Sequence, residues 1–585
     1  MPTVAEYLSL RLIELGADHL FSIPGNYTAE FLLSAQAIGI DCVGTTNELE
    51  AGYAADSYAR YRGIGVCCAT YGVGSHSLYN AISGAYVEFC PVVLINGSPP
   101  PSKFENLKHR GILFAHAIDP IRTDAKIFEE VTVASAVICD PFEAPQEIDR
   151  VLGECVKTSR PVYIEVLQGI WSAECDAPKA PLSKSIQHGP IANSAADVAA
   201  KLIMEKIHHA RRPVIWGGEL LTRRKLVDLF RALVRQSGLP YTTTLMGKGL
   251  IAETEFADQF VGVYDSKFAP QDVRDVVEQS DCLLALGTIM SDFYADVVIN
   301  SKDRMILASD DAVRIGPVLY PNVPLSLLLP RLIELLGAER PSSELTGLQV
   351  LTERRAAMSQ DAMERPSDSP ITYDNFFKTV GRFLTEEHTL LVDTSLALFP
   401  SADLTIKRQG GYVAQTAWLS IGYTCGATLG VATVDPATKV LAIVGDGGFQ
   451  MLPQSFSTLA KRGCDAVVFV LDNGTYGIEQ YLVDMQILPP PERFFQNRLP
   501  AASFFDVLPR WDYAKLGEAF GGQGITVSKL ADLERFLHDP GRGPVLVGVS
   551  IDQHDLPAEI AATIPTAAEN MRRNGTRAVA LDAFD

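Results

Sequence analysis

The sequence predicts an α/β protein with three doubly wound parallel sheets, because two features recur along the chain. Short aliphatic runs such as LAIV (441–444) and AVVFVL (466–471) have the composition of buried parallel strands, and helical segments separate them. Glycine turns with polar residues follow these strands, as in GDG (445–447) and DNG (472–474). Because open parallel sheets bind ligands at the carboxyl ends of their strands, a functional site is expected in these turns.

Composition limits the classes of protein to consider. The 585 residues are 47% hydrophobic, which supports large buried cores, and the length suggests about four domains, or fewer if these are large. A net charge of −20 argues against a nucleic-acid partner. The ten cysteines are scattered without metal-site spacing, and only Cys67 and Cys68 are adjacent. We therefore expect reduced, buried thiols in a cytoplasmic protein.

The sequence shows no sign of export or membrane insertion. Residues 1–16, MPTVAEYLSLRLIELG, carry charges inside an amphipathic helical pattern, unlike a secretory signal. No apolar run approaches about eighteen residues, the length that would span a membrane. We expect neither a signal peptide nor a membrane partner.

The first predicted domain covers residues 1–185. It begins with a helix over Val4–Leu15, which Gly16 ends. Strands, turns and helices then alternate through HLFSIPGN (19–26), the segment 41–63 and the segment 65–98. This alternation predicts a doubly wound parallel sheet.

Two further domains follow, separated by polar, proline-containing segments. Residues 176–190 form the first predicted linker, and Glu339–Pro370 the second, enclosing one helix. The central domain is expected over 191–340 and the third domain over 371–555. Residues 556–585 form an alanine- and charge-rich tail that packs on a neighbour or frays.

The third domain carries the most restrictive chemistry, in residues 444–479. Asp446 offers a carboxylate, Asn473 an amide oxygen and Thr475 a backbone carbonyl, an oxygen set that suits a hard cation such as Mg²⁺. The cation keeps its remaining positions for water and phosphate oxygens. Glycines let the backbone N–H groups approach a diphosphate, whose charge the following helix N-terminus favours. These glycines are Gly445, Gly447 and Gly448.

The motif GDG, a gap, and then Asp472-Asn473 resembles the thiamine diphosphate fingerprint, with Asp472 in place of the first of two asparagines. Further motifs extend the resemblance over nearly the whole chain and identify it as similar to the thiamine diphosphate-dependent 2-oxo acid decarboxylases. They are PGN (24–26), NELEAGYAADSYAR (47–60), TYGVGSHSLYNAISGAYVE (70–88), MGKGLIAE (246–253), GTIMSDF (287–293), WLSIGYT (418–424) and YGIE (476–479).

The resemblance implies a pyrimidine-binding first domain, a central domain without its own cofactor, and a third domain that binds the diphosphate and Mg²⁺. It also implies that two chains share each active site, so that a homodimer is the minimum and a homotetramer is usual. The substrate is a 2-oxo acid, which loses CO₂ to give an aldehyde.

The resemblance also assigns roles to individual residues. Glu48 protonates the aminopyrimidine ring and so promotes removal of the C2 proton of the cofactor. The generic alternative for Glu48 is a helix-start acid beside the capping Asn47. Glu479 assists decarboxylation and protonates the enamine, and Ile421 props the cofactor in its bent form. The other expected cofactor contacts are Thr70, Asn80, Thr394 and Ile478.

Two departures from the family concern proton transfer. Asn26 stands where these decarboxylases usually carry Asp, and an amide cannot relay a proton at neutral pH. The adjacent histidine pair is also missing: His116 is the best match to it, and His109 is the competitor. His76, in a turn expected to face the cofactor, could supply a proton instead. Slow protonation of the enamine would favour its capture by an acceptor aldehyde, giving a 2-hydroxyketone.

Side-chain volume suggests the substrate class. Leu398 matches a position where enzymes for small substrates tend to place Trp, and Phe293, Ile478 and Leu482 are the other expected pocket residues. The smaller Leu398 predicts an aromatic or longer aliphatic 2-oxo acid. A carboligase or lyase of the acetolactate-synthase type remains the nearest alternative. A cofactor-binding scaffold without turnover is a third, against which the retained Glu48 and Glu479 argue.

Overall fold

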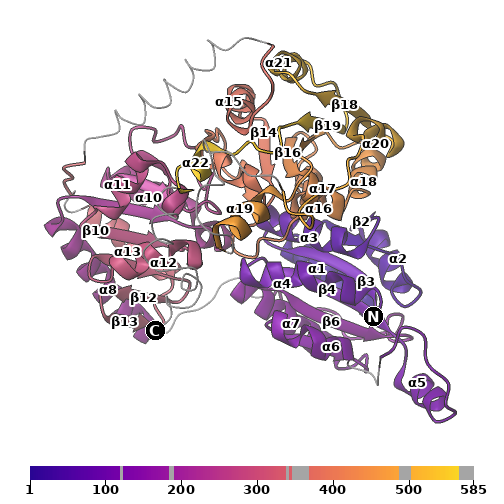
Figure 1. Ribbon diagram of the computed structural model, residues 1–585. Coiled ribbons are helices and arrows are strands. Elements are labelled where there is room, and N and C mark those ends of the chain that lie inside the picture. Colours follow the sequence, from indigo (N-terminus) through magenta and orange to yellow (C-terminus); the bar gives the residue numbers. More distant parts are fainter. Residues whose placement is uncertain (119–122, 183–189, 338–340, 346–367, 487–501, 565–585) are drawn as a thin grey trace. The chain divides into compact units, whose positions relative to one another are not determined.

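A computed structural model describes residues 1–118, 123–182, 190–337, 341–345, 368–486 and 502–564 (Figure 1). The chain forms two compact units. The first contains residues 1–187, 417–437 and 452–465, and the second contains residues 188–416, 438–451 and 466–585. The helix expected inside the second linker, and the tail beyond residue 564, lie outside the described residues.

The first unit contains a parallel sheet with strand order β2-β1-β3-β4-β6-β5. All neighbouring strands are parallel, and the chain places β2 on one side of β1 and β3 on the other, as a doubly wound sheet requires. Its strands are β1 (His19–Ser22), β2 (Asp41–Gly44), β3 (Gly65–Thr70), β4 (Val92–Ser98), β5 (Ser135–Ile138) and β6 (Val162–Leu167).

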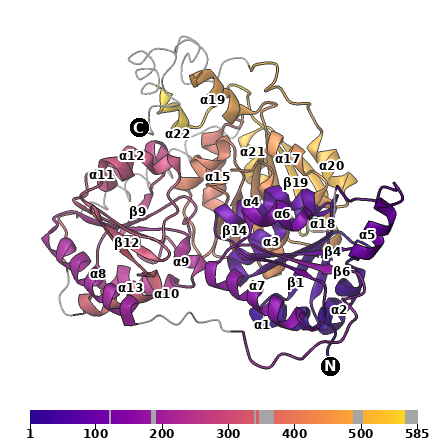
Figure 2. The same cartoon turned by 90° about the horizontal axis from the view of Figure 1, so that it is seen from below.

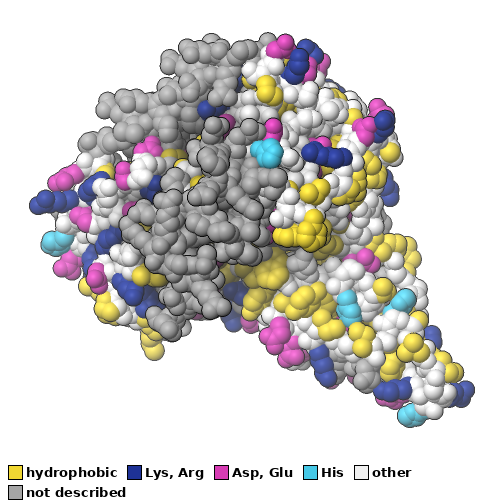
Figure 3. Space-filling view, in the orientation of Figure 1, with side chains coloured by type: hydrophobic (Ala, Val, Ile, Leu, Met, Phe, Trp, Pro, Cys, Tyr) yellow, Lys and Arg dark blue, Asp and Glu magenta, His cyan; other side chains and the backbone are white. Residues whose placement is uncertain are grey.

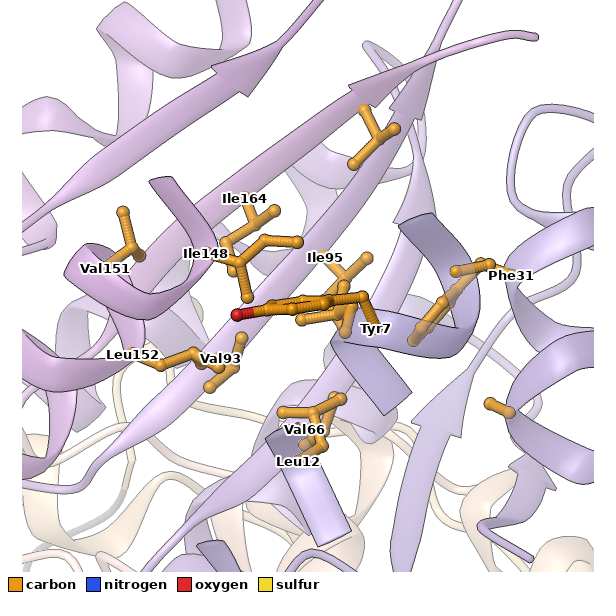
Figure 4. Close-up of a cluster of buried hydrophobic side chains, with 14 of the residues drawn as sticks. Tyr7, Leu12, Phe31, Val66, Val93, Ile95, Ile148, Val151, Leu152 and Ile164 are labelled. Carbon is orange, nitrogen blue, oxygen red and sulfur yellow. The ribbon is translucent and has the colours of Figure 1, made fainter. Parts of the chain in front are cut away.

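Helices cover both faces of this sheet (Figure 2). On one face a large apolar cluster joins three helices to the inner strands, and Tyr7, Phe31 and Ile148 lie in it beside Val93 and Ile95 (Figure 4). The described helices of this unit's amino-terminal part are α1 (Val4–Leu15), α2 (Ala29–Ile38), α3 (Glu48–Arg62), α4 (Tyr79–Val87), α5 (Pro101–Lys108), α6 (Thr123–Phe128), α7 (Ala144–Thr158), η1 (Ser75–Leu78) and η2 (Glu129–Val131).

Helix α1 has the bounds predicted for it, and the structure shows why. Thr3 and Glu6 form a capping box, with bonds of 3.2 Å from Glu6 N to Thr3 Oγ1 and 2.8 Å from Thr3 N to Glu6 Oε2. Such a cap contributes about 1 kcal/mol. Gly16 ends the helix with a φ of 101°, in the left-handed region that favours glycine.

Two helices from the expected third domain belong to the first compact unit. They are α16 (Tyr423–Val434) and α18 (Ser455–Arg462). Helix α16 packs very closely on α3, because a Cβ atom at Gly430 would lie 2.1 Å from both the Ala54 carbonyl oxygen and Ser57 Oγ. Only glycine fits at this position. The small residues Ala54 and Ser57 of α3, within the motif NELEAGYAADSYAR, let the two helices approach this closely.

The second unit contains the two other sheets. The third sheet is parallel throughout, with order β15-β14-β16-β17-β19-β18. The central sheet, in order β13-β12-β11-β10-β7-β8-β9, differs from the prediction at one edge, where the short hairpin strands β12 and β13 are antiparallel. Three parallel-sheet α/β arrangements are therefore confirmed.

The strands of the central sheet are β7 (Pro213–Gly217), β8 (Tyr241–Thr243), β9 (Phe260–Val263), β10 (Cys282–Leu286), β11 (Met305–Ala308), β12 (Ala312–Ile315) and β13 (Val318–Pro321). Those of the third sheet are β14 (His388–Val392), β15 (Tyr412–Ala414), β16 (Lys439–Gly445), β17 (Ala466–Asp472), β18 (Gln523–Val527) and β19 (Val545–Ser550).

The helices of the second unit alternate with these strands, and they shield the sheets from water. Its described helices are α8 (Pro190–His209), α9 (Leu220–Arg223), α10 (Val227–Ser237), α11 (Gln271–Glu278), α12 (Ala295–Asn300), α13 (Leu325–Leu336), α15 (Tyr373–Phe383), α17 (Asp446–Met451), α19 (Gly477–Gln486), α20 (Tyr513–Ala519), α21 (Leu530–His538), α22 (Ala558–Ala561), η3 (Ser266–Phe268), η4 (Asp292–Tyr294), η5 (Leu396–Leu398) and η6 (Pro400–Asp403).

The MGKGLIAE segment joins the two sheets of the second unit. Lys248 is buried and donates to Glu253 Oε1 at 2.7 Å and to the Leu404 carbonyl at 2.6 Å. Glu253 Oε2 in turn accepts from the Ile406 N–H at 2.8 Å. Both buried charges therefore have close partners, which burial requires, and the motif has a structural role here.

Candidate active site

Asp446 lies where β16 meets α17, so the expected GDG turn is a strand that runs directly into a short helix. Its carboxylate accepts from the Gly474 N–H at 2.7 Å and from the Gly447 N–H at 3.0 Å. Strand pairing places Gly445 opposite Leu471, so Asp446 and Asp472 both follow a paired position. The carboxyl ends of these two strands therefore meet, as predicted.

Asn473 is buried in the next turn, with its amide oriented by two hydrogen bonds. Its Oδ1 accepts from the Thr475 N–H at 3.0 Å, and its Nδ2 donates to Tyr373 Oη at 3.4 Å. The side chain of Thr475 is also buried, and its Oγ1 has no hydrogen-bond partner among the described residues. One buried oxygen without a hydrogen-bond partner thus lies next to Gly474, whose N–H binds Asp446.

The electrostatics of this turn fit a divalent cation. Burial, together with the neighbouring Asp472 carboxylate, raises the pKa of Asp446 above its ordinary value. A hard cation would compensate this charge and use the oxygens of Asp446 and Asn473. No group of three His, Cys, Asp or Glu side chains with metal-binding geometry occurs in the described residues. The predicted ligand set of one carboxylate, one amide and one carbonyl stays a prediction.

Glycine is needed for different reasons at different positions of these turns. A Cβ at Gly447 would lie 2.4 Å from the Tyr476 ring, so this position admits no side chain. Gly474, which the fingerprint did not single out, has a φ of 73° and needs glycine for its backbone conformation. A Cβ at Gly445 would meet only Ser395, at an ordinary 3.4 Å.

A segment that the sequence did not indicate lies along this turn. Leu508 N donates to the Gly474 carbonyl at 3.0 Å, and Tyr476 N donates to the Asp506 carbonyl at 2.9 Å. Arg510 contacts the turn as well, with 2.6 Å from its Nη1 to Asp472 Oδ1 and 3.0 Å from its Nη2 to the Asn473 carbonyl. No motif in the sequence connects residues 506–510 to the cofactor fingerprint, so only the fold could reveal this contact.

Glu479 lies in the first turn of α19, where its side chain is exposed. Ile478 beside it is partly exposed, and Leu482, one turn further on, has 39% of its surface exposed. Among the described residues, these side chains form an open face close in sequence to the cation turn. Their contact with a substrate or cofactor stays a prediction.

The other residues predicted for this unit are Leu398 and Phe293 for the pocket and Thr394 for the cofactor. Leu398 is buried in η5, and Thr394 Oγ1 donates to the Gln415 carbonyl at 3.3 Å. Phe293 has its ring centroid 6.2 Å from that of Phe268, which packs on Phe399 at 4.3 Å. Phe293 and the residue after Leu398 therefore belong to one aromatic cluster.

The remaining predicted residues belong to the first unit. Glu48 is the first residue of α3 and is partly exposed. The cap of this helix is made by Asn47, whose Oδ1 accepts from Glu50 N at 3.0 Å, and by Glu50, whose carboxylate accepts from Thr46 N at 2.8 Å. The helix start is thus capped by its neighbours, which leaves the Glu48 carboxylate available for other chemistry.

The turn after β3 brings several more of these residues to one edge of the sheet. A Cβ at Gly25 would lie 2.8 Å from Thr70 Cβ, so the PGN turn carrying Asn26 lies against Thr70. A Cβ at Gly72 would lie 2.0 Å from the His116 carbonyl oxygen, and the rings of Tyr71 and His116 are 5.9 Å apart. His116 therefore lies beside this turn, and its match to the family histidine stays a prediction. His109 ends α5 as its C-cap.

His76 is fixed by Asp124, a buried residue that the sequence did not suggest. Asp124 Oδ1 lies 3.2 Å from His76 Nε2, and its Oδ2 accepts from Gly72 N at 2.7 Å and from Ser75 Oγ at 2.6 Å. The same oxygen accepts from Asn96 Nδ2 at 3.0 Å. One carboxylate thus shapes the turn and orients its histidine.

Ile421 is partly exposed in a segment that polar side chains hold in place. Ser420 Oγ lies 2.6 Å from Tyr53 Oη and accepts from Asn80 Nδ2 at 2.9 Å, and Asn80 Oδ1 accepts from Trp418 Nε1 at 2.8 Å. Asn80, expected to line the pyrimidine pocket, therefore binds the segment that carries Ile421. Its direct contact with a cofactor stays a prediction.

The chain matches three domains described for thiamine pyrophosphate enzymes. The N-terminal thiamine pyrophosphate-binding domain matches residues 2–118, the central domain residues 200–327, and the C-terminal thiamine pyrophosphate-binding domain residues 398–549. These matches, with the turns described above, define a thiamine diphosphate-dependent enzyme.

Curated relatives narrow this class. The chain is 30% identical to a pyruvate decarboxylase of Aspergillus fumigatus, covering 97% of each chain, and 30% identical to pyruvate decarboxylase 2 of Arabidopsis thaliana, covering 89% of this chain and 82% of the relative. Pyruvate decarboxylase 1 of Zea mays is 29% identical, with 88% and 81% covered. The chain belongs to the thiamine diphosphate-dependent 2-oxo acid decarboxylase family and is an enzyme of that type.

In the described part of the chain, no helix is both long and apolar enough to cross a membrane.

Proposed function

We propose that this decarboxylase acts on an aromatic or longer aliphatic 2-oxo acid and uses Mg²⁺ to hold its cofactor. The buried oxygens at the ends of β16 and β17 are the observation that carries the cofactor part of this proposal. Asp446, Asn473 and the Thr475 carbonyl would hold the cation, which would bind the diphosphate. Bound thiamine diphosphate supplies the carbanion nucleophile and the electron sink for loss of CO₂.

The protein side chains provide positions and protons. Glu48, freed from capping, is the candidate acid beside the aminopyrimidine, and Ile421 is the candidate support for the bent cofactor. Glu479 is the candidate that would supply a proton after CO₂ leaves. His76 and His116 are the candidates for moving protons near Asn26, whose amide can orient a substrate carbonyl by hydrogen bonding.

The substrate class rests on Leu398. Leucine is much smaller than tryptophan, so a Leu at this position leaves room for a larger substrate side chain. Ile478, Leu482 and Phe293 add an apolar lining, which favours an aromatic or aliphatic group over a charged one.

A second candidate function is carboligation, and a specific observation favours it. The loop that carries His116 has Ala115 directly before it, so the histidine pair of the family is absent. If enamine protonation is slow, an acceptor aldehyde can capture the intermediate and form a 2-hydroxyketone.

We also propose a homodimer, and a homotetramer as the usual assembly. Large apolar side chains are exposed near both predicted cofactor edges, and Figure 3 shows hydrophobic side chains at the surface over α4. Contact with a second copy would cover them. They are Val73, Tyr79, Leu113 and Trp418 in the first unit and Leu482, Phe504 and Phe505 in the second.

We also propose a cytoplasmic location, which the free cysteines of the described residues fit. The thiol of Cys67, for example, is buried, and burial raises its pKa to about 12.

One experiment tests the proposed substrate class and the second candidate function together. The purified protein is incubated with thiamine diphosphate, Mg²⁺ and a panel of 2-oxo acids, with and without an acceptor aldehyde, and the products are analysed. Preferred release of an aldehyde from phenylpyruvate or a branched-chain acid supports the proposed substrate. A preference for pyruvate contradicts it, and mainly hydroxyketone product supports the second function.

A further inference from the structure

Asp472 is the residue at which this chain departs from the cofactor fingerprint, and the structure gives it a partner. It ends β17, directly before the proposed cation ligand Asn473. The Asp472 carboxylate accepts from Arg510 Nη1 at 2.6 Å, and the same guanidinium donates from Nη2 to the Asn473 carbonyl at 3.0 Å. The aspartate side chain is 19% exposed and the arginine side chain 57%. The pair therefore lies at the rim of the turn, where solvent screens it only in part.

The backbone fixes Arg510 over the turn. Residues 506–510 run antiparallel to residues 473–476, with a bridge between Thr475 and Val507 and a 3.0 Å bond from Leu508 N to the Gly474 carbonyl. Gln450 Nε2, from α17, donates to the Pro509 carbonyl at 3.1 Å. A Cβ at Gly474 would lie only 2.2 Å from the guanidinium carbon of Arg510, so the guanidinium sits directly on this glycine. The positive charge is held in place beside the proposed cation site.

Arg510 balances the extra negative charge that Asp472 brings to the turn. Asp446 brings one negative charge to the turn, Asp472 a second, and Arg510 one positive charge, which leaves a net charge of −1. An uncharged asparagine at position 472, as in the fingerprint, would leave the same net charge with no arginine. The pair thus retains the electrostatic balance of the turn although a carboxylate has entered it.

We propose that Asp472 and Arg510 form a compensated charge pair that sets the affinity of the diphosphate site for its divalent cation. This inference rests on the proposed role of Asp446 and Asn473 as ligands. A negative charge near a cation strengthens its binding, and a positive charge weakens it. Removing Asp472 should therefore lower the affinity for the cation, and removing Arg510 should raise it. Removing both returns the affinity close to its starting value. A pair that only fastened the segment 506–510 would behave differently, because every break would then weaken binding.

The test is a double-mutant cycle on the full-length protein, read out by binding rather than turnover. Binding of Mn²⁺ is measured by calorimetry at saturating thiamine diphosphate, for the natural protein and for Asp472→Asn, Arg510→Gln and the double variant. Asp472→Asn leaves Arg510 unbalanced and should weaken Mn²⁺ binding about tenfold. Arg510→Gln should tighten it by about the same factor, and the double variant should lie within about threefold of the natural protein. Both single effects should shrink when the salt concentration is raised from ~0.1 M to ~0.5 M, because the pair is partly exposed and salt screens exposed charges.

Matched controls come from the opposite end of the same sheet. Lys439 begins β16 and is paired with Glu387 at 2.7 Å, with both side chains exposed. Lys439→Gln and Glu387→Gln make the same charge changes far along the strand and should leave Mn²⁺ affinity unchanged. Arg510→Lys retains the charge and should also bind Mn²⁺ nearly as the natural protein does, if charge is what matters.

The outcomes separate the inference from the function on which it rests. Weaker binding in both single variants, with the double variant weakest, would show a structural tie and overturn the inference. Loss of affinity in Arg510→Lys equal to that in Arg510→Gln would overturn it as well. If the natural protein binds no Mn²⁺ in the presence of thiamine diphosphate, the proposed ligand set itself is wrong.

Discussion

The two cofactor edges of this protein are built in different ways. In the second unit the turns proposed to hold the cation lie together, and the N–H groups of Gly447 and Gly474 hold the Asp446 carboxylate at 3.0 and 2.7 Å. In the first unit the candidate residues Glu48, His76 and His116 come from three separate segments and remain at least partly exposed. The proposed diphosphate edge is therefore preformed by backbone hydrogen bonds, whereas the candidate residues of the first unit are more exposed. The homodimer proposed above would cover these exposed side chains.

The largest expected effect is at the preformed edge. Asp446→Ala removes the only carboxylate of the proposed ligand set, and Mn²⁺ affinity should fall at least about 100-fold, because hard cations depend on charged oxygens. Thiamine diphosphate affinity in calorimetry should fall with it. Asp539→Ala, an exposed position in the same unit, is the control and should change neither. Retained Mn²⁺ affinity in Asp446→Ala would remove Asp446 from the site.

At the other edge, Glu48→Gln should abolish chemistry while retaining binding. Exchange of the cofactor C2 proton with deuterium, followed by NMR after acid quench, should slow by about 100-fold or more, since a glutamine cannot give a proton to the ring. Affinity for thiamine diphosphate should change little, because the proposed contacts with the diphosphate do not include Glu48. Glu30→Gln, which alters the first-turn acid of α2, is the matched control and should exchange normally. Normal exchange in Glu48→Gln would eliminate this role.

The sequence predicted most of what local pattern controls. The strand ends carrying Asp446 and Asn473, the helix Val4–Leu15 and the alternating elements of all three sheets follow from residues near one another in the chain. It did not predict Asp124 or Arg510, whose partners lie 48 and 38 residues away. Nor did it predict that α16 packs on α3, since the glycines that permit this contact look like ordinary helix residues. Contacts of this kind depend on the fold and leave no local signal.

Asp124 offers a way to test how the exposed edge is held. Its carboxylate receives hydrogen bonds from Gly72, Ser75 and Asn96, so Asp124→Ala removes one buried acceptor that three donors share. Unfolding by urea should show a loss of about 3 kcal/mol, whereas Asp124→Asn, whose amide oxygen can accept the same bonds, should lose about 1 kcal/mol. His76→Ala, which removes only the outermost contact, serves as the comparison and should be nearly neutral for stability. Equal stability of Asp124→Ala and the natural protein would show that this carboxylate does not hold the turn.

The smallest expected effect concerns substrate choice at Leu398. Leu398→Trp should raise the ratio of kcat/KM for pyruvate to that for phenylpyruvate about tenfold, because a larger ring leaves less room for the substrate side chain. Leu398 is buried, so the substitution also strains its surroundings by about 1–3 kcal/mol. The ratio is the proper measurement, since a loss of folded protein lowers both values equally. Leu319→Trp, on the half-exposed edge strand β13, should leave the ratio unchanged. If Leu398→Trp also left it unchanged, Leu398 would not line the substrate pocket, and the pocket would have to be sought nearer Ile478 and Leu482.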